Sequence, residues 1–296
     1  MKKSLFKGSG VAIVTPMNDD GSINYDALGD IIEFQINSKT DAIIVCGTTG
    51  ESATLTDEEH SSVIKFTVDR VNKRIPVIAG TGSNDTKHAL ELSLAAQELG
   101  VDGLLIVTPY YNKTSQKGLV KHYTYIADRV NLPIILYNVP SRTGCSISVD
   151  TCVKLSQHHN IVAIKEASGN ISHVAKIIAA CKDDLDVYSG NDDQTVAMMA
   201  LGAKGVISVF ANICPRQSHE ICSEFFHNNI SESARLQLKY LNLMNALFSD
   251  VNPIPIKEAM NMMGFKCGKC RMPLDSMSED KYLELRNVMH SYGLII

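Results

Sequence analysis

The chain has 296 residues, with 28 Lys and Arg against 32 Asp and Glu, so its formal net charge is −4. Because neither nucleic acid nor an anionic membrane surface attracts an acidic protein, this balance argues against both as the main partner. A hydrophobic content of 45% with only 20% charged residues is typical of a packed globular chain and excludes a disordered one.

Two further features indicate a cytoplasmic protein. No apolar run approaches the ~20 residues of a membrane-spanning helix, and the apolar stretch at residues 11–14 is too short for a signal peptide. The eight cysteines are irregularly spaced, as buried thiols usually are, so we expect reduced thiols. Cys267 and Cys270 have the spacing of a zinc site, but no second pair completes a ligand set, so we predict a plain loop and no metal.

Short β-branched runs recur along the chain. They are apolar along most of their length rather than alternating, which is the pattern of parallel strands covered on both faces. The runs lie at residues 11–15, 42–46, 76–80, 103–107, 133–137, 161–165, 186–189 and 205–209. We therefore predict eight buried parallel strands.

Segments with helical periodicity lie between these runs. Thr56 and Glu59 have the spacing of a capping box, and the apolar residues that follow them fall on one helical face. Successive runs are spaced as a strand plus a return helix requires. Eight such units close into a (β/α)8 barrel, so the predicted fold is an α/β TIM barrel.

The pattern changes at about residue 212, where strand signals stop and helical stripes, interrupted by Asn-Pro-Ile-Pro at 252–255, take over. We predict a barrel catalytic domain over residues 1–211 and a C-terminal helical region over residues 212–296. A doubly wound sheet that binds a dinucleotide is disfavoured, because Gly80-Thr81-Gly82 lacks the third glycine of that fingerprint.

Barrel enzymes carry their reacting groups at the carboxyl ends of the strands, so polar residues there are the first candidates. Lys165 ends the sixth run, where a partly desolvated amine could attack a carbonyl and form an imine. Position alone also allows a structural lysine, whose methylene groups pack along the end of the barrel while its amine stays in solvent. Tyr137 ends the fifth run and could carry protons, and Arg142 offers a planar fork for a carboxylate. For either residue alone, a structural role is the favoured interpretation.

The second run ends in Gly47-Thr48-Thr49-Gly50. Its glycines allow the backbone to approach a small ligand, and its hydroxyls and amides can hold a carboxylate or relay a proton. Taken by itself, a glycine loop is weak support for a site.

Four segments together are far more specific. They are Gly-Thr-Thr-Gly-Glu at 47–51, Tyr-Tyr at 110–111, Tyr-Asn-Val-Pro-x-Arg-Thr-Gly at 137–144 and Ile-Lys-Glu-Ala at 164–167. In this order they resemble the pyruvate-dependent class I aldolase superfamily, also called the N-acetylneuraminate lyase superfamily, and within it the dihydrodipicolinate synthase family. The likeness runs from about residue 8 to residue 274. It implies a Schiff-base lyase that condenses pyruvate with L-aspartate 4-semialdehyde, on the way to diaminopimelate and lysine.

The resemblance also implies roles for the catalytic groups. Lys165 would form the Schiff base with pyruvate, and Tyr137, Thr48 and Tyr111 would relay protons. Tyr111 would reach into the site of a neighbouring subunit, in a homotetramer built as a dimer of dimers. Because the iminium nitrogen accepts the electrons, no metal or organic cofactor is expected.

Substrate-binding roles follow in the same way. Thr48 and Thr49 would hold the carboxylate of pyruvate, and Arg142 would bind the carboxylate of the second substrate. Backbone groups at Gly190 and Ile207 would line the pocket beside the lysine.

Lysine-sensitive members of the family have an inhibitor cleft between subunits, and six positions of this chain match it: Ser52, Ala53, His60, Asn84, His88 and Tyr110. However, Asp57 stands where such members often have His, and His88 stands where they carry a Glu that pairs with the ligand's ammonium. Losing that carboxylate removes a charge-assisted contact worth ~1.5–3 kcal/mol. We expect inhibition by lysine to be weak or absent.

Three alternatives stay open. The same imine could serve a sugar-derived aldehyde, as in N-acetylneuraminate lyase or 2-keto-3-deoxygluconate aldolase, although Arg142 favours a substrate with an amino-acid carboxylate. A metal-dependent aldolase would need His, Asp and Glu with ligand spacing at the strand ends, and the sequence offers no such set. A non-catalytic barrel that only binds a small carboxylate would not need every reacting group to be present.

Overall fold

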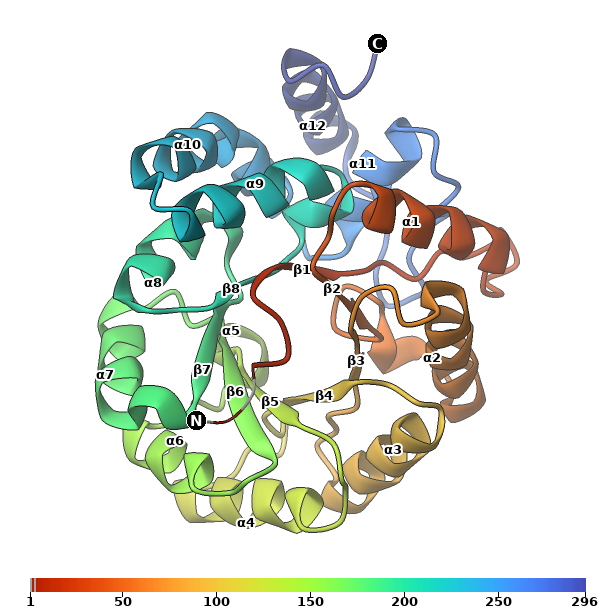
Figure 1. Ribbon diagram of the computed structural model, residues 1–296. Coiled ribbons are helices and arrows are strands. Elements are labelled where there is room, and N and C mark those ends of the chain that lie inside the picture. The colour runs from red at the N-terminus through yellow and green to blue at the C-terminus, as the bar shows by residue number, and fades with distance from the viewer. Residues whose placement is uncertain (1, 3) are drawn as a thin grey trace.

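Parallel strands close on themselves to form a barrel, which Figure 1 shows along its axis. The computed structural model describes residue 2 and residues 4–296, and within them each strand pairs with its neighbours in chain order, with β8 returning to β1. The strands are β1 Gly8–Ala12, β2 Ala42–Val45, β3 Val77–Gly80, β4 Gly103–Val107, β5 Ile134–Asn138, β6 Ile161–Glu166, β7 Asp186–Ser189 and β8 Gly205–Ser208. The predicted (β/α)8 barrel is confirmed.

The position predicted for the first strand was wrong, because β1 spans Gly8–Ala12 and not residues 11–15. The strand begins with glycine and serine, which carry no β-branched signal. Gly8 and Gly205 both have positive φ, and a Cβ on Gly205 would lie 1.8 Å from the Gly8 carbonyl oxygen. The barrel therefore closes where only glycine fits, and an apolar pattern cannot reveal such a position.

Helices return the chain from strand to strand and form an outer ring (Figure 1). They are α1 Tyr25–Asn37, α2 Asp57–Val71, α3 Thr86–Glu98, α4 Gln116–Ala127, α5 Pro140–Thr143, α6 Val149–Ser156, α7 Ile171–Cys181, α8 Thr195–Leu201 and α9 Pro215–Phe226. Short 3₁₀ turns complete the connections: η1 Ser52–Thr54, η2 Lys182–Asp184, η3 Asp192–Gln194 and η4 Phe210–Asn212.

The capping box predicted at the start of α2 is confirmed. The Glu59 amide donates to Thr56 Oγ1 at 3.2 Å, and the Thr56 amide donates to Glu59 Oε2 at 3.0 Å. Two amides that the helix leaves unpaired are thereby satisfied, which places the first turn of α2 directly after η1.

The apolar core has two layers. The larger layer fills the space between the sheet and the ring of helices. The smaller layer lies inside the barrel and includes Phe6, Ile44, Ile135 and Tyr188. Phe6 stacks on Tyr188 with ring centroids 4.4 Å apart, and the Tyr188 hydroxyl donates to the Phe6 carbonyl oxygen. The N-terminal segment, red in Figure 1, crosses one end of the barrel, and its Phe6 packs there against Tyr188 of β7.

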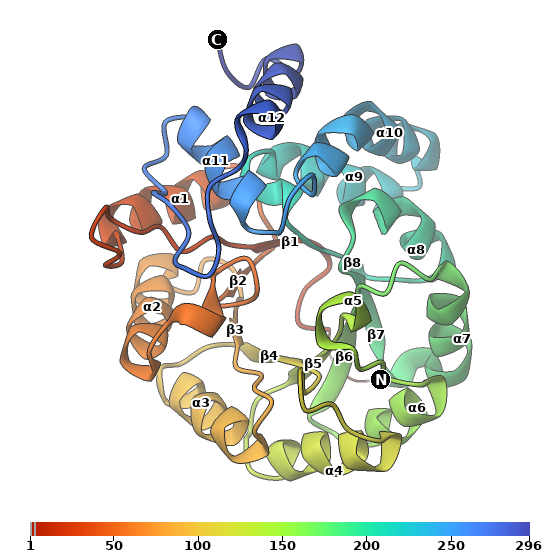
Figure 2. The ribbon, with the colours of Figure 1, turned by 180° about the vertical axis from the view of Figure 1, so that it is seen from behind.

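The chain continues after η4 as helices. Helix α9 packs against β1, so it covers the barrel itself, and α10 Ile230–Ala246 packs on α9. Helices α11 Ile254–Met262 and α12 Glu279–Ser291 follow. In Figure 2, which shows the opposite end of the barrel, the blue segment between them lies near the turn that follows β2. The division of the chain at residues 211 and 212 stays a prediction.

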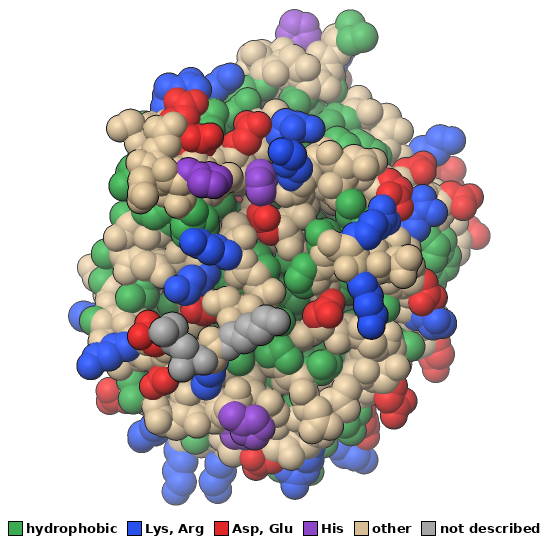
Figure 3. All heavy atoms as spheres, in the orientation of Figure 1, with side chains coloured by type: hydrophobic (Ala, Val, Ile, Leu, Met, Phe, Trp, Pro, Cys, Tyr) green, Lys and Arg blue, Asp and Glu red, His purple; other side chains and the backbone are tan. Residues whose placement is uncertain are grey.

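The surface carries charges of both signs. On the face in Figure 3, the described basic and acidic side chains are interspersed. Among the described residues, the helices lack the combination of length and apolarity that a membrane span requires.

We expect Phe6→Ala to lower the free energy of unfolding by about 3–5 kcal/mol, because it leaves a cavity beside Tyr188 in the barrel interior. Urea unfolding followed by circular dichroism measures this change. Phe248 is 48% exposed, so Phe248→Ala is the matched control and is expected to cost much less. An equal decrease in the free energy of unfolding for the two variants would contradict the packing of Phe6 inside the barrel.

Candidate active site

Lys165 and Tyr137 are neighbours across two paired strands. The register of β5 and β6 places Tyr137 opposite Lys165. Lys165 is only 6% exposed, and its Nζ lies 4.4 Å from the centroid of the Tyr137 ring. Both positions are one residue from the carboxyl end of their strand. The structure thus brings together the amine and the phenol at the end of the barrel where barrel enzymes react.

A buried carboxylate lies near this amine. Asp192 Oδ2 accepts hydrogen bonds from the Val209 and Phe210 amides at 3.1 and 3.0 Å. Burial raises the pKa of Asp192, and that increase is opposed first by hydrogen bonds from Ser208 and from the Phe210 and Val209 amides, and last by the nearby charge of Lys165. Asp192 therefore joins η3 to the end of β8 beside the amine, a role that sequence reasoning did not predict.

Residues 48–51 form a tight turn directly after β2. The Glu51 amide donates to the Thr48 carbonyl oxygen at 3.1 Å, and Thr15 Oγ1 donates to the Gly50 carbonyl oxygen at 2.7 Å. A Cβ on Gly80 would lie 2.3 Å from the Cys46 carbonyl oxygen, so β3 can approach the start of this turn only as glycine. A hydrogen bond from Thr15 therefore fixes the turn on one side, and β3 packs closely against the residues just before it on the other.

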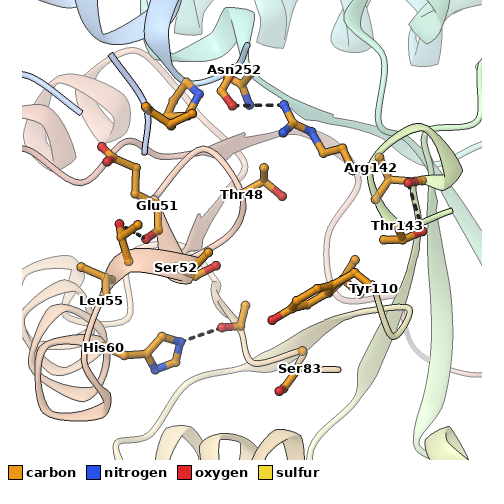
Figure 4. Close-up of a pocket in the computed structure, with 18 of the residues that line it drawn as sticks. Thr48, Glu51, Ser52, Leu55, His60, Ser83, Tyr110, Arg142, Thr143 and Asn252 are labelled. Carbon is orange, nitrogen blue, oxygen red and sulfur yellow. Dashed lines mark hydrogen bonds between the residues drawn. The ribbon is translucent and has the colours of Figure 1, made fainter. Parts of the chain in front are cut away.

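The side chains of this turn have different surroundings. Thr48 lines a cavity of about 470 Å³, and Figure 4 shows it between Glu51 and Arg142. Thr49 is buried, and its Oγ1 accepts a hydrogen bond from Asn252 Nδ2 at 3.0 Å. Because its oxygen is the acceptor in that bond, the Thr49 hydroxyl keeps its own hydrogen for another acceptor.

Arg142 lies on the single-turn helix α5, which begins at Pro140 and follows β5 directly. Its side chain lines the same cavity, and its Nη2 donates to the Asn252 carbonyl oxygen at 3.1 Å (Figure 4). Asn252 therefore contacts both Thr49 and Arg142. Sequence reasoning missed it because it lies far along the chain, and the only signal was the Asn-Pro-Ile-Pro break at residues 252–255.

Six of the eight predicted catalytic and substrate-binding residues do not line this cavity: Thr49, Tyr111, Tyr137, Lys165, Gly190 and Ile207. Tyr137 packs inside the barrel with Ile207. Gly190 donates its amide to the Glu166 carbonyl oxygen at 2.8 Å, which places it beside the residue that follows Lys165. Tyr111 is 92% exposed and has a φ of 68°, so within one chain its side chain makes almost no packing contact.

Five of the residues that match the inhibitor cleft line the same cavity as Thr48 and Arg142: Ser52, Ala53, His60, His88 and Tyr110. Asn84 lines a second cavity of about 330 Å³. The two exchanged positions contact each other, because His88 Nε2 lies 3.0 Å from Asp57 Oδ1. The carboxylate at this end of the cavity is therefore already paired with an imidazole.

Cysteine and acidic residues do not form a metal site in the described part of the chain. No group of three or more His, Cys, Asp or Glu is placed there to hold an ion. All eight cysteines are free thiols, with Cys267 buried and Cys270 half-buried. Burial raises the pKa of both thiols to about 12.

His60 gives a test of this wall of the cavity. Its Nε2 lies 2.8 Å from the Gly80 carbonyl oxygen, and burial lowers its pKa below the ordinary value of 6.5. Just below that value the unfolded chain binds a proton that the folded chain does not, so stability should decrease as the pH decreases. We expect His60→Gln to reduce the loss in free energy of unfolding between about pH 7.5 and about pH 5.5, measured with urea. His290→Gln, on the exposed side of α12, is the matched control, and an identical pH dependence in all three proteins would contradict the assignment.

With the geometry described, similarity to known proteins can be stated. The model of the dihydrodipicolinate synthetase family matches residues 5–292. A 4-hydroxy-tetrahydrodipicolinate synthase of Acetivibrio thermocellus is 56% identical over 295 residues, which is 100% of both chains. Another, from Caldicellulosiruptor bescii, is 55% identical and covers 99% of each chain.

Solved structures agree with this match over the full length. Dihydrodipicolinate synthase of Aquifex aeolicus superposes with a TM-score of 0.96 at 46% identity, covering 98% of this chain and 99% of its own. The enzyme of Cyanidioschyzon merolae, solved with lysine bound, gives 0.96 at 38% identity and covers 99% and 100%. The conclusion from fold, motif order and similarity is that the chain belongs to the dihydrodipicolinate synthetase family.

Proposed function

We propose that the protein is a Schiff-base lyase that condenses pyruvate with L-aspartate 4-semialdehyde to 4-hydroxy-tetrahydrodipicolinate, in lysine and diaminopimelate biosynthesis. The observation that carries this proposal is the buried Lys165 amine, 4.4 Å from the Tyr137 ring centroid at the strand ends. It is supported by full-length relatives that are named 4-hydroxy-tetrahydrodipicolinate synthase. We place the reaction in the cytoplasm.

The first half of the reaction activates pyruvate. The Lys165 nitrogen attacks C2 of pyruvate, and the carbonyl oxygen leaves as water after taking up two protons. The resulting iminium accepts electrons, so a proton can leave the C3 methyl group and an enamine forms. The attack requires the uncharged amine, so Lys165 must give up its ammonium proton before the carbon–nitrogen bond forms.

The second half builds the ring. Enamine C3 attacks the aldehyde carbon of the second substrate, and the aldehyde oxygen takes a proton to become the 4-hydroxyl group. The substrate's own amine then attacks the imine carbon. That bond displaces Lys165, closes the six-membered ring and returns the lysine as a free amine.

Tyr137, Thr48 and Tyr111 relay the protons. The strand register places Tyr137 opposite Lys165, which carries the reacting nitrogen, and Thr48 lines the cavity. Tyr111 belongs to the site of a neighbouring subunit, which its 92% exposure in a single chain supports. A complete site therefore needs at least two chains, and we propose a tetramer assembled as a dimer of dimers.

Two carboxylates are bound separately. The pyruvate carboxylate is held by Thr48 and Thr49, and the free hydrogen of the Thr49 hydroxyl suits it to that acceptor. Arg142 binds the carboxylate of the aldehyde substrate with the guanidinium donors that Asn252 leaves free. Backbone groups at Gly190 and Ile207 line the pocket near the imine. A sugar-derived aldehyde offers no carboxylate for Arg142 at this point, so we do not favour the sugar aldolases.

Borohydride reduction in the presence of pyruvate tests the central step. We expect one pyruvate-derived label per chain, and peptide mass mapping should find it on Lys165. Lys165→Ala should remain folded by circular dichroism and take up no label. Lys257 is also buried, so it is the internal control, and label on Lys257 or on no lysine would contradict the mechanism.

Tyr137→Phe tests the proton relay. Removal of the hydroxyl should slow turnover roughly 10²- to 10⁴-fold, the usual contribution of a positioned acid-base group. Because the amine remains, the variant should still trap pyruvate at Lys165. Steady-state rates and trapping are measured on the same preparation, and a wild-type rate in this variant would remove Tyr137 from the relay.

Lysine inhibition tests the altered cleft. We expect submillimolar lysine to leave the rate almost unchanged, because the Asp57 carboxylate is already paired with His88. The double exchange Asp57→His with His88→Glu should strengthen inhibition at least tenfold by restoring a charge-assisted contact worth ~1.5–3 kcal/mol. Each rate is expressed relative to the same protein without lysine, and strong inhibition of the unaltered chain would refute the expectation.

A further inference from the structure

The 48–51 turn has unusual backbone conformations at its start and its end. Cys46, just before the turn, has a φ of 53°, and Glu51, its last residue, has a φ of 55°. Such left-handed conformations are unfavourable for residues other than glycine and persist only where the surroundings hold them. The contacts of Glu51 are therefore informative about how the turn is maintained.

Glu51 lines the cavity, but its carboxylate is bound on the side of the C-terminal segment. Its side chain is 1% exposed, its Oε1 accepts from Lys257 Nζ at 2.8 Å, and its Oε2 accepts from the Arg271 amide at 2.8 Å. In Figure 4 its carboxylate points toward the blue C-terminal segment. Lys257, on α11, is also 1% exposed and gives a second hydrogen bond, of 2.8 Å, to the Lys269 carbonyl oxygen.

A fully buried ion pair is poorly explained by stability alone. Removing two charges from water costs about as much as their attraction returns, and apolar residues of the same volume are often equally stable. The pair does supply direction, because its hydrogen bonds fix where the Glu51 carboxylate lies. Since the Glu51 amide closes the turn onto Thr48, a displaced Glu51 would displace Thr48 and Thr49 with it.

We propose that Lys257 is a positioning residue, which holds the pyruvate-binding turn in its strained conformation through its buried ion pair with Glu51. This inference rests on the proposed function, because it takes Thr48 and Thr49 as the groups that bind the pyruvate carboxylate. It makes the C-terminal helices part of the active site, although none of their side chains touches the reacting atoms.

A second attachment allows the proposal to be tested without unfolding the segment. The Arg271 side chain pairs with Glu59 on α2 and donates to the Gly21 and Thr54 carbonyl oxygens. These contacts do not involve Lys257. They should keep the C-terminal segment in place when the buried pair is removed.

The experiment uses the double variant Glu51→Gln with Lys257→Met, which removes both charges and leaves neither one buried alone. Short borohydride pulses at increasing pyruvate give the concentration for half-maximal labelling of Lys165. We expect that concentration to rise at least fivefold, with wild-type labelling at saturation. Any smaller rise overturns the proposal. Glu51→Gln alone is the second variant, and the same criterion applies to it if the double variant does not fold.

The readout separates positioning from a merely structural role. Loss of folded protein lowers the labelling at saturation but does not change the half-maximal concentration. Lys281 forms a partly exposed ion pair with Asp250 in the same region, so Lys281→Met is the matched control and should behave as wild type. A wild-type chain that traps no pyruvate refutes the proposed function, whereas normal wild-type labelling with an unshifted variant refutes only the role of Lys257.

Discussion

The closure of the barrel between β1 and β8 is the constraint on which the rest of the structure depends. Gly8 and Gly205 approach so closely that a Cβ on the second would overlap the carbonyl oxygen of the first. Only after this closure does the sheet have an inside. Lys165 and Tyr137 are then both buried, with the amine nitrogen 4.4 Å from the centroid of the phenol ring.

The candidate site is assembled from segments that are distant in the sequence. The 48–51 turn follows β2, Arg142 follows β5, and Asn252 comes from the chain beyond the barrel. Asn252 donates its side-chain amide to Thr49 in the turn and accepts from Arg142 with its carbonyl oxygen. Lys257 forms an ion pair with Glu51, the last residue of the turn. The C-terminal segments therefore contribute contacts to the candidate site that the barrel alone does not make. They contact Thr49, Glu51 and Arg142, in the segments that we propose bind the substrates.

What could be predicted from the sequence follows from how local each signal is. Buried parallel strands are continuous apolar runs, so their number and order were readable, and with them the strand-end positions of Lys165 and Tyr137. The first strand was misplaced because its opening residues are selected for small size. Asn252 and the Glu51–Lys257 pair were missed for a different reason. Their partners lie about two hundred residues apart, and no periodicity links them.

The stacked rings of Phe6 and Tyr188 inside the barrel also bear on the route by which substrates reach Lys165. Packed side chains fill the barrel interior there, so we expect substrates to approach from the carboxyl ends of the strands, where the described cavity lies. Lys165 is buried, whereas Arg142 is exposed. In the proposed mechanism the keto acid must bind Lys165 before the aldehyde can react, because the attacking enamine forms only on that lysine.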